Sequence, residues 1–219
     1  MSASALVPGP LYGLRTWTIV GETGHERLAG PQRPAPWPVD GEWLTAACAL
    51  HPEHLAPASG CSCGIHAWHP RRRSARQVLG FRSRVAGVLE AGGALEVHRD
   101  GFRAERGRPF ALFAAPRGNA ALVGRLAAAY RAEVVEASCP DAILAWCDER
   151  GLGLDPAVVD DLLGPEGVAA ARRARRATRI RIALVTGAIA AMLVLGLELT
   201  ADPGDRPLFG RTGPVHGSP

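Results

Sequence analysis

The alternation of apolar and polar residues predicts β-structure in the first half of the chain. Residues 14–20 (LRTWTIV) are rich in β-branched and aromatic residues, which favours a strand. Apolar and polar residues also alternate within 84–106, where Gly92-Gly93 predicts a turn and Asp100-Gly101 is typical of a two-residue hairpin turn. We therefore expect a small antiparallel meander of three strands in 84–106.

Apolar residues at helical spacing predict helices in the second half. Residues 119–131 begin with Asn as N-cap, residues 140–150 begin with Pro and stop at a Gly, and residues 155–163 begin with Asp-Pro. Residues 133–136 predict a short strand between the first two helices. The expected fold class is α+β: a small antiparallel β-meander with a Cys/His-rich loop, followed by helices and one C-terminal transmembrane helix.

A long apolar run predicts the transmembrane helix. Residues 182–197 carry no charge, and the run extended to Thr200 would measure about 28 Å at ~1.5 Å per residue. That length is close to the ~30 Å thickness of a bilayer's hydrocarbon core. A buried core helix is the competing interpretation, but the arginines that precede the run favour a membrane.

Six arginines between Arg172 and Arg181 set the expected orientation. By the positive-inside rule they keep residues 1–181 in the cytoplasm, which gives a single-pass, tail-anchored protein of the cell membrane. The same cluster is expected to bind anionic lipid headgroups. The chain would then comprise five segments: a flexible N-terminus (1–13), a cytoplasmic α+β domain (14–164), a basic juxtamembrane helix (165–181), the transmembrane helix (182–200) and a disordered tail (201–219).

The charge and the cysteines narrow the function further. The net charge is +4, but the arginines beside the membrane account for it, so we do not expect nucleic-acid binding; Arg71–Arg76 is interpreted as a solvated patch. No signal peptide opens the chain, so we expect a reducing compartment. Five cysteines at uneven spacing then favour metal binding or thiol chemistry over a disulfide framework.

Residues 48–69 hold the candidate chemistry. This stretch contains three of the five cysteines and four of the seven histidines. Zinc takes four nitrogen or sulfur ligands in a tetrahedron, and a closed set of protein ligands makes a structural site. The Cys-x-Cys spacing strains chelation, which Gly64 would relieve by letting the backbone turn. The predicted Cys3His zinc ligands are Cys48, His54, Cys61 and Cys63.

Two alternatives to a zinc site stay open. The cysteines of the stretch could be small buried hydrophobic residues and its histidines surface residues. We expect Cys139 and Cys147, on or near a helix, to be such core residues. Alternatively, Cys61 and Cys63 could form a reactive pair in a thiol-redox sensor or a membrane-associated enzyme. A catalytic zinc site is not indicated, because the chain has no HExxH pattern.

The stretch resembles a motif of uncharacterised actinobacterial proteins. Residues 61–67 (CSCGIHA) are similar to their Cys-x-Cys-Gly-Ile-Tyr-Ala pattern, and Val85–Glu105 is similar to a second block. The resemblance covers about residues 14–137, and that family has no established activity. Where the motif of those proteins has Tyr, this chain has His66, which argues against His66 as an essential metal ligand. His51 and His69 stay possible substitutes for a predicted ligand. The second block draws attention to His98, Arg103 and Glu105. These residues could bind an anionic ligand, but we interpret them as polar residues on the solvated face of the meander.

We therefore expect a non-enzymatic protein. Its cytoplasmic domain would hold a structural zinc and act as an interaction or adaptor module for a protein partner that the sequence does not identify. The clustered ligands, the lack of a catalytic pattern and the predicted anchor support this expectation.

Overall fold

The structure is a computed structural model of the chain. It describes residues 10–31, 33–81, 84–115 and 118–200. The chain divides into two units, Met1–Ala171 and Arg172–Pro219. The first unit contains the sheet and the Cys/His-rich stretch.

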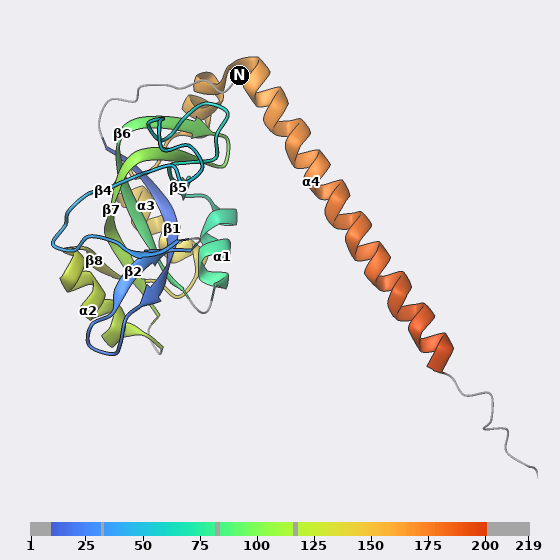
Figure 1. Ribbon diagram of the computed structural model, residues 1–219, viewed down its shortest axis with the longest axis horizontal. Helices are drawn as coiled ribbons and strands as arrows, with labels where there is room; N and C mark the ends of the chain where they lie inside the picture. Colours follow the sequence, from blue (N-terminus) through green and yellow to red (C-terminus); the bar gives the residue numbers. More distant parts are fainter. Residues whose placement is uncertain (1–9, 32, 82–83, 116–117, 201–219) are drawn as a thin grey trace, which may run out of the picture. The chain divides into compact units, whose positions relative to one another are not determined.

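Three long strands form the centre of an eight-stranded sheet: β1 (Leu11–Val20), β6 (Val85–His98) and β7 (Gly101–Ala114) (Figure 1). β6 pairs antiparallel with β1 and with β7. Strand β1 thus begins three residues earlier than predicted. The shorter strands are β2 (Arg27–Gly30), β3 (Arg33–Pro36), β4 (Leu44–Thr45), β5 (Ile65–Trp68) and β8 (Glu133–Glu136), of which β8 runs parallel to β7.

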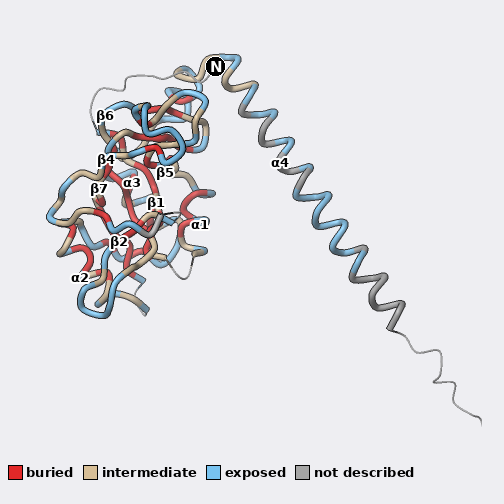
Figure 2. Tube along the Cα trace, in the orientation of Figure 1, coloured by how far each residue is buried: buried red, intermediate tan, exposed pale blue. Residues whose placement is uncertain are grey.

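Successive side chains of the central strands belong to two buried clusters. Figure 2 shows long buried stretches along these strands. Leu112 packs in the cluster that includes α2 (Ala120–Tyr130). The next residue, Phe113, packs with α1 (Arg72–Gly80) and α3 (Pro140–Glu149). Because neighbouring residues of a strand point to opposite faces, α2 covers one face of the sheet and α1 with α3 the other. Where helices cover both faces, as at 85–89 of β6 and 110–114 of β7, successive residues are consequently apolar.

The predicted three-stranded meander is wrong, although its hairpin exists. The structure has two 14-residue strands, β6 and β7, joined at Arg99-Asp100. Gly92-Gly93 lies inside β6, where the pairing shifts register before Leu95. Two glycines can absorb such a bulge without reversing the chain. The turn also lies one residue earlier than the predicted Asp100-Gly101, so Gly101 already belongs to β7.

The predicted helices of the second half are present. α2 follows Asn119, α3 begins at Pro140, and the strand between them is β8. The last helix, α4 (Pro156–Thr200), is broken at Gly164, whose φ of 65° and ψ of 172° are not helical. The sequence predicts this break between 163 and 165.

The transmembrane helix stays a prediction. Over the residues that the structure describes, no helix combines the length and the apolarity needed to cross a bilayer. The side chains of 193–200, which would complete the predicted span, lie outside the described residues, as do the predicted tail 201–219 and residues 1–9 of the predicted flexible N-terminus. On the described part of α4, Leu184 and Met192 are 68% and 73% exposed.

Candidate metal centre

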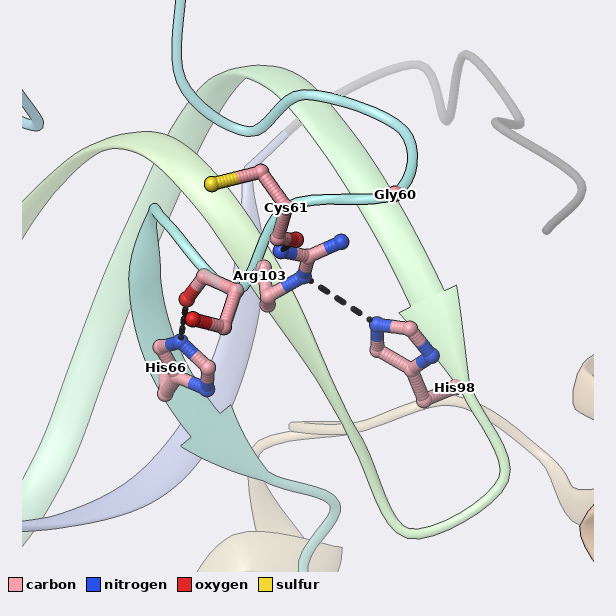
Figure 3. Close-up of a pocket in the computed structure, with 6 residues that line it drawn as sticks. Gly60, Cys61, His66, His98 and Arg103 are labelled. Carbon is pink, nitrogen blue, oxygen red and sulfur yellow. Dashed lines mark hydrogen bonds between the residues drawn. The ribbon is translucent and has the colours of Figure 1, made fainter. Parts of the chain in front are cut away.

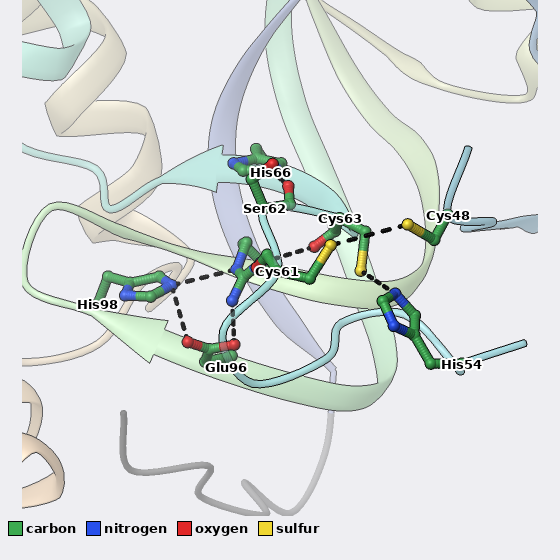
Figure 4. Close-up of polar contacts among 9 residues, drawn as sticks. Cys48, His54, Cys61, Ser62, Cys63, His66, Glu96 and His98 are labelled. Atoms are coloured by element: carbon green, nitrogen blue, oxygen red, sulfur yellow. Dashed lines mark hydrogen bonds and ion pairs between the residues drawn. The ribbon is translucent and has the colours of Figure 1, made fainter. Parts of the chain in front are cut away.

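The fold brings the four predicted ligands together. Cys48 and His54 lie in the long loop between β4 and β5, and Cys61 and Cys63 immediately precede β5. Their ligand atoms all lie within 4.8 Å of one another (Figure 4). This cluster could hold a metal ion.

Two of the six distances between ligand atoms are close to the edges of a zinc tetrahedron. Zn–S bonds of ~2.3 Å and Zn–N bonds of ~2.0–2.1 Å place two sulfurs ~3.8 Å apart and a sulfur and a nitrogen ~3.6 Å apart. The Sγ atoms of Cys48 and Cys61 are 3.7 Å apart, and Cys63 Sγ lies 3.3 Å from His54 Nε2. These two pairs therefore already have nearly the spacing that a tetrahedral ion requires, and all four ligand atoms lie within 4.8 Å of one another.

The backbone around the ligands adapts to this arrangement. Gly64 follows the Cys-x-Cys pair with a φ of 114°, as its predicted role requires. A Cβ there would lie 3.2 Å from the Cβ atoms of Arg103 and Pro57. The backbone N–H of His51 donates to Cys48 Sγ over 3.3 Å, which ties the turn after Cys48 to that sulfur.

A buried ion pair lies beneath the ligand loop. Arg103 on β7 pairs in register with Glu96 on β6 and with His66 on β5. The Arg103 guanidinium contacts the Glu96 carboxylate and also donates to the carbonyl oxygens of Cys61 and Cys63. Arg103 and Glu96 are 6% and 2% exposed, so the interpretation of Arg103 as part of a solvated face is wrong. The loop covers this face.

The other histidines of the stretch do not join the cluster. His69 is 1% exposed, and its Nε2–H donates to the carbonyl oxygen of His98 over 2.9 Å. His66 bonds to the carbonyl oxygen of Ser62 over 2.9 Å, and burial lowers the pKa of its imidazole. His51 is exposed, with Nδ1 3.3 Å from the carboxylate of Glu53. His69 is thus a core residue rather than a substitute ligand.

A pocket of about 390 Å³ opens beside the cluster (Figure 3). His98 lies at its rim and accepts a hydrogen bond from Nε–H of Arg103 over 3.3 Å. Burial lowers the pKa of His98, and its Nε2 also lies 3.5 Å from Oε1 of Glu96. The residues that line the pocket are Gly60, Cys61, Ser62, His66, His98 and Arg103.

The two remaining cysteines lie away from the cluster. Cys147 on α3 is buried, and burial raises the pKa of its thiol to about 12. Cys139, the residue before α3, is exposed. The prediction of a core position is therefore confirmed for Cys147 and wrong for Cys139.

Glu96 is the residue of this region that the sequence argument missed. The predicted Asp100-Gly101 turn would place Glu96 opposite Glu105, a repulsive pair. The observed turn places it opposite Arg103. The charge signs around the hairpin could therefore have indicated both the register and the ion pair.

Comparison of the chain with protein-family models, with curated proteins and with solved structures gives no match. The resemblance of the Cys-x-Cys motif to uncharacterised actinobacterial proteins stays a prediction.

Proposed function

We propose that Cys48, His54, Cys61 and Cys63 bind a structural zinc ion. The observation that carries this proposal is the convergence of three thiols and one imidazole within 4.8 Å. Thiolate-rich tetrahedral sites select zinc over magnesium and calcium, which prefer oxygen ligands. Four protein ligands leave no open position for a substrate, so the ion would fasten the loop between β4 and β5 rather than catalyse a reaction.

Substitution with Co²⁺ tests the proposed coordination. Tetrahedral Co²⁺ with thiolate ligands has visible absorption bands and a sulfur-to-metal charge-transfer band that octahedral Co²⁺ lacks. We expect these bands in the wild type and their displacement by Zn²⁺. His54→Ala should weaken or change them, whereas His25→Ala, outside the cluster, should not. Bands that survive His54→Ala unchanged would contradict the ligand set.

We propose in addition that the domain is a non-enzymatic interaction module. Large apolar side chains of the first unit are mostly buried, yet Leu50 and Leu55 on the metal loop are 77% and 90% exposed. Both lie within two residues of a proposed ligand, so zinc would fix their positions. A contiguous exposed apolar patch is typical of a surface that another protein covers, and the proposal takes Leu50 and Leu55 as parts of one such patch.

Crosslinking in cells tests this module. A photo-crosslinking residue at Leu55 should give discrete protein adducts that Leu50→Ser reduces without loss of zinc. Val134 and Val158, which are apolar and 45% and 46% exposed outside the metal loop, provide control positions. Adducts that are equal at Leu55 and at the control positions would contradict a specific surface.

The C-terminal part of α4 is proposed to anchor the protein in the cell membrane, with the first unit in the cytoplasm. Its support is the uncharged run from Ile182, preceded by arginines of which Arg172, Arg173 and Arg176 are exposed. In cell fractionation we expect the full chain in the membrane pellet after an alkaline carbonate wash, and two charges introduced by Val185→Asp/Ile189→Asp should release it. Release of the wild type by salt alone would contradict a span and indicate surface binding through the arginines.

A thiol-redox sensor is the alternative function. The predicted pair for this role is Cys61 and Cys63, and Cys48 and Cys61, whose Sγ atoms are 3.7 Å apart, form a second candidate pair. A disulfide between them would exclude the zinc tetrahedron. The two functions therefore predict opposite thiol reactivity.

A further inference from the structure

We propose that the Glu96–Arg103 pair is a positioning element that presets the metal-ligand loop. The pair touches none of the four proposed ligand atoms, but it holds the backbone of two residues that carry them. The inference rests on the proposed zinc site and adds residues outside the coordination sphere that set its affinity.

One guanidinium nitrogen of Arg103 fixes the Cys-x-Cys turn. Its Nη1 donates to the carbonyl oxygen of Cys61 and, over 3.0 Å, to that of Cys63. Two carbonyls two residues apart can meet one nitrogen only if the backbone folds between them. Because the backbone sets the direction of each Cα–Cβ bond, these two hydrogen bonds restrict where the two sulfurs can lie.

The rest of the guanidinium is fixed from the other side. Its Nη2 contacts the Glu96 carboxylate, and its Nε–H donates to His98 Nε2 over 3.3 Å. Because the guanidinium is planar and rigid, the hydrogen bonds made by its Nε, Nη1 and Nη2 atoms cannot change direction independently. Rotation of Arg103 to follow a moving loop would break the contact with Glu96.

The burial of the pair indicates a specific role. The side chains of Arg103 and Glu96 are 7% and 2% exposed. Burying two charges costs more than their attraction returns unless further hydrogen bonds satisfy them. Here the additional partners are His98 and the carbonyls of the ligand loop, so the loop and the pair stabilise each other.

A second pair on the same hairpin provides the comparison. Arg108 and Glu90 are also register partners on β7 and β6, with a contact of 2.8 Å. Arg108 is more exposed, at 37% of its side chain, and its additional acceptor is the carbonyl oxygen of Gly41, which is not a ligand residue. The hairpin thus carries one pair under the metal loop and one pair away from it.

Zinc affinity measured by chelator competition with the full chain tests the proposal. Residues outside the coordination sphere that orient metal ligands typically change affinity by ~10–100-fold. We expect Arg103→Met to weaken zinc binding by about that factor. Arg103→Lys should recover only part of it, because one ammonium cannot reach Glu96 and both carbonyls together. Arg108→Met should leave the affinity unchanged.

Metal-free stability separates positioning from general support of the fold. Arg103→Met that lowers the stability of the zinc-free protein but leaves zinc affinity unchanged would overturn the proposal. If Arg103→Met does not fold, Glu96→Gln decides, because it keeps the arginine and removes only the charge that orients it. We expect weaker zinc binding in that variant too, and unchanged affinity would overturn the proposal. A wild type that binds no zinc refutes the zinc site itself, and this proposal with it.

Discussion

At the residue scale, Gly64 makes the tight spacing of two ligands possible. Its φ of 114° directs the chain from the Cys-x-Cys pair into β5. A side chain at this φ is strained, and a Cβ would also press on Arg103 and Pro57. This role could be predicted from the sequence because chelation by a Cys-x-Cys pair requires an unusual backbone, which glycine supplies most readily.

Gly64→Ala should therefore destabilise the metal-free protein by about 1–3 kcal/mol, the typical cost of forcing a residue into a sparsely populated conformation. Gly60→Ala is the control, because Gly60 has a φ of 81° but no atom within 4 Å of its Cβ position. Denaturant unfolding should show the larger loss for Gly64→Ala. An equal or smaller loss would contradict the close packing of the loop on β7.

The five cysteines should separate by reactivity in the zinc-bound protein. Exposed Cys139 should react with an alkylating reagent first, and Cys147 should resist until unfolding because burial raises the pKa of its thiol to about 12. Cys48, Cys61 and Cys63 should be protected until a chelator is added, as mass spectrometry can show. Their rapid labelling without chelator, or a Cys48–Cys61 disulfide in freshly isolated protein, would favour the redox alternative.

At the scale of elements, the β6–β7 hairpin shows what pattern alone can and cannot establish. Alternating residues and Asp100-Gly101 indicated a hairpin correctly. They did not distinguish a turn from a bulge at Gly92-Gly93, since glycine suits both. They also missed the burial of Glu96, because the loop that covers it comes from a distant part of the chain. The alternation of apolar and polar residues within a strand carries no information about a distant loop that covers one of its faces.

The contact between α2 and the start of β2 gives a pH prediction. Arg125 on α2 hydrogen-bonds to Glu26 over 2.6 Å and, mainly through this bond, lowers the pKa of Glu26 from 4.5 to about 2. A carboxylate with a lower pKa in the folded state stabilises that state above its unfolded pKa. The stabilisation is lost as pH falls from about 4.5 to about 2.

Glu26→Gln should accordingly be less stable than the wild type near neutral pH, and the difference should vanish as pH approaches about 2. Urea unfolding across this pH range measures it. Arg125→Met should remove the same pH dependence, because it takes away the hydrogen bond that shifts the pKa. A stability difference that persists undiminished at the acid end would contradict the pairing.

At the scale of the whole molecule, the sequence predicted the elements better than their assembly. The helices α2 and α3, the strand β8 and the break at Gly164 could be predicted because caps, prolines and glycines are local signals. The eight-stranded sheet could not, since pairing of β1 with β6 and of β5 with β7 joins distant segments. The four ligands could be chosen from type and spacing, whereas the ion pair beneath them depends on that assembly.

The zinc content of the purified full chain tests the central claim most directly. Elemental analysis should give a zinc-to-protein ratio near unity for the wild type and for Cys139→Ser. The Cys61→Ser/Cys63→Ser variant should lose the zinc and unfold at a lower denaturant concentration than the zinc-bound wild type, because no ion would hold the loop between β4 and β5 in place. A wild type that is purified without zinc and is no more stable than the double variant would contradict a structural metal site.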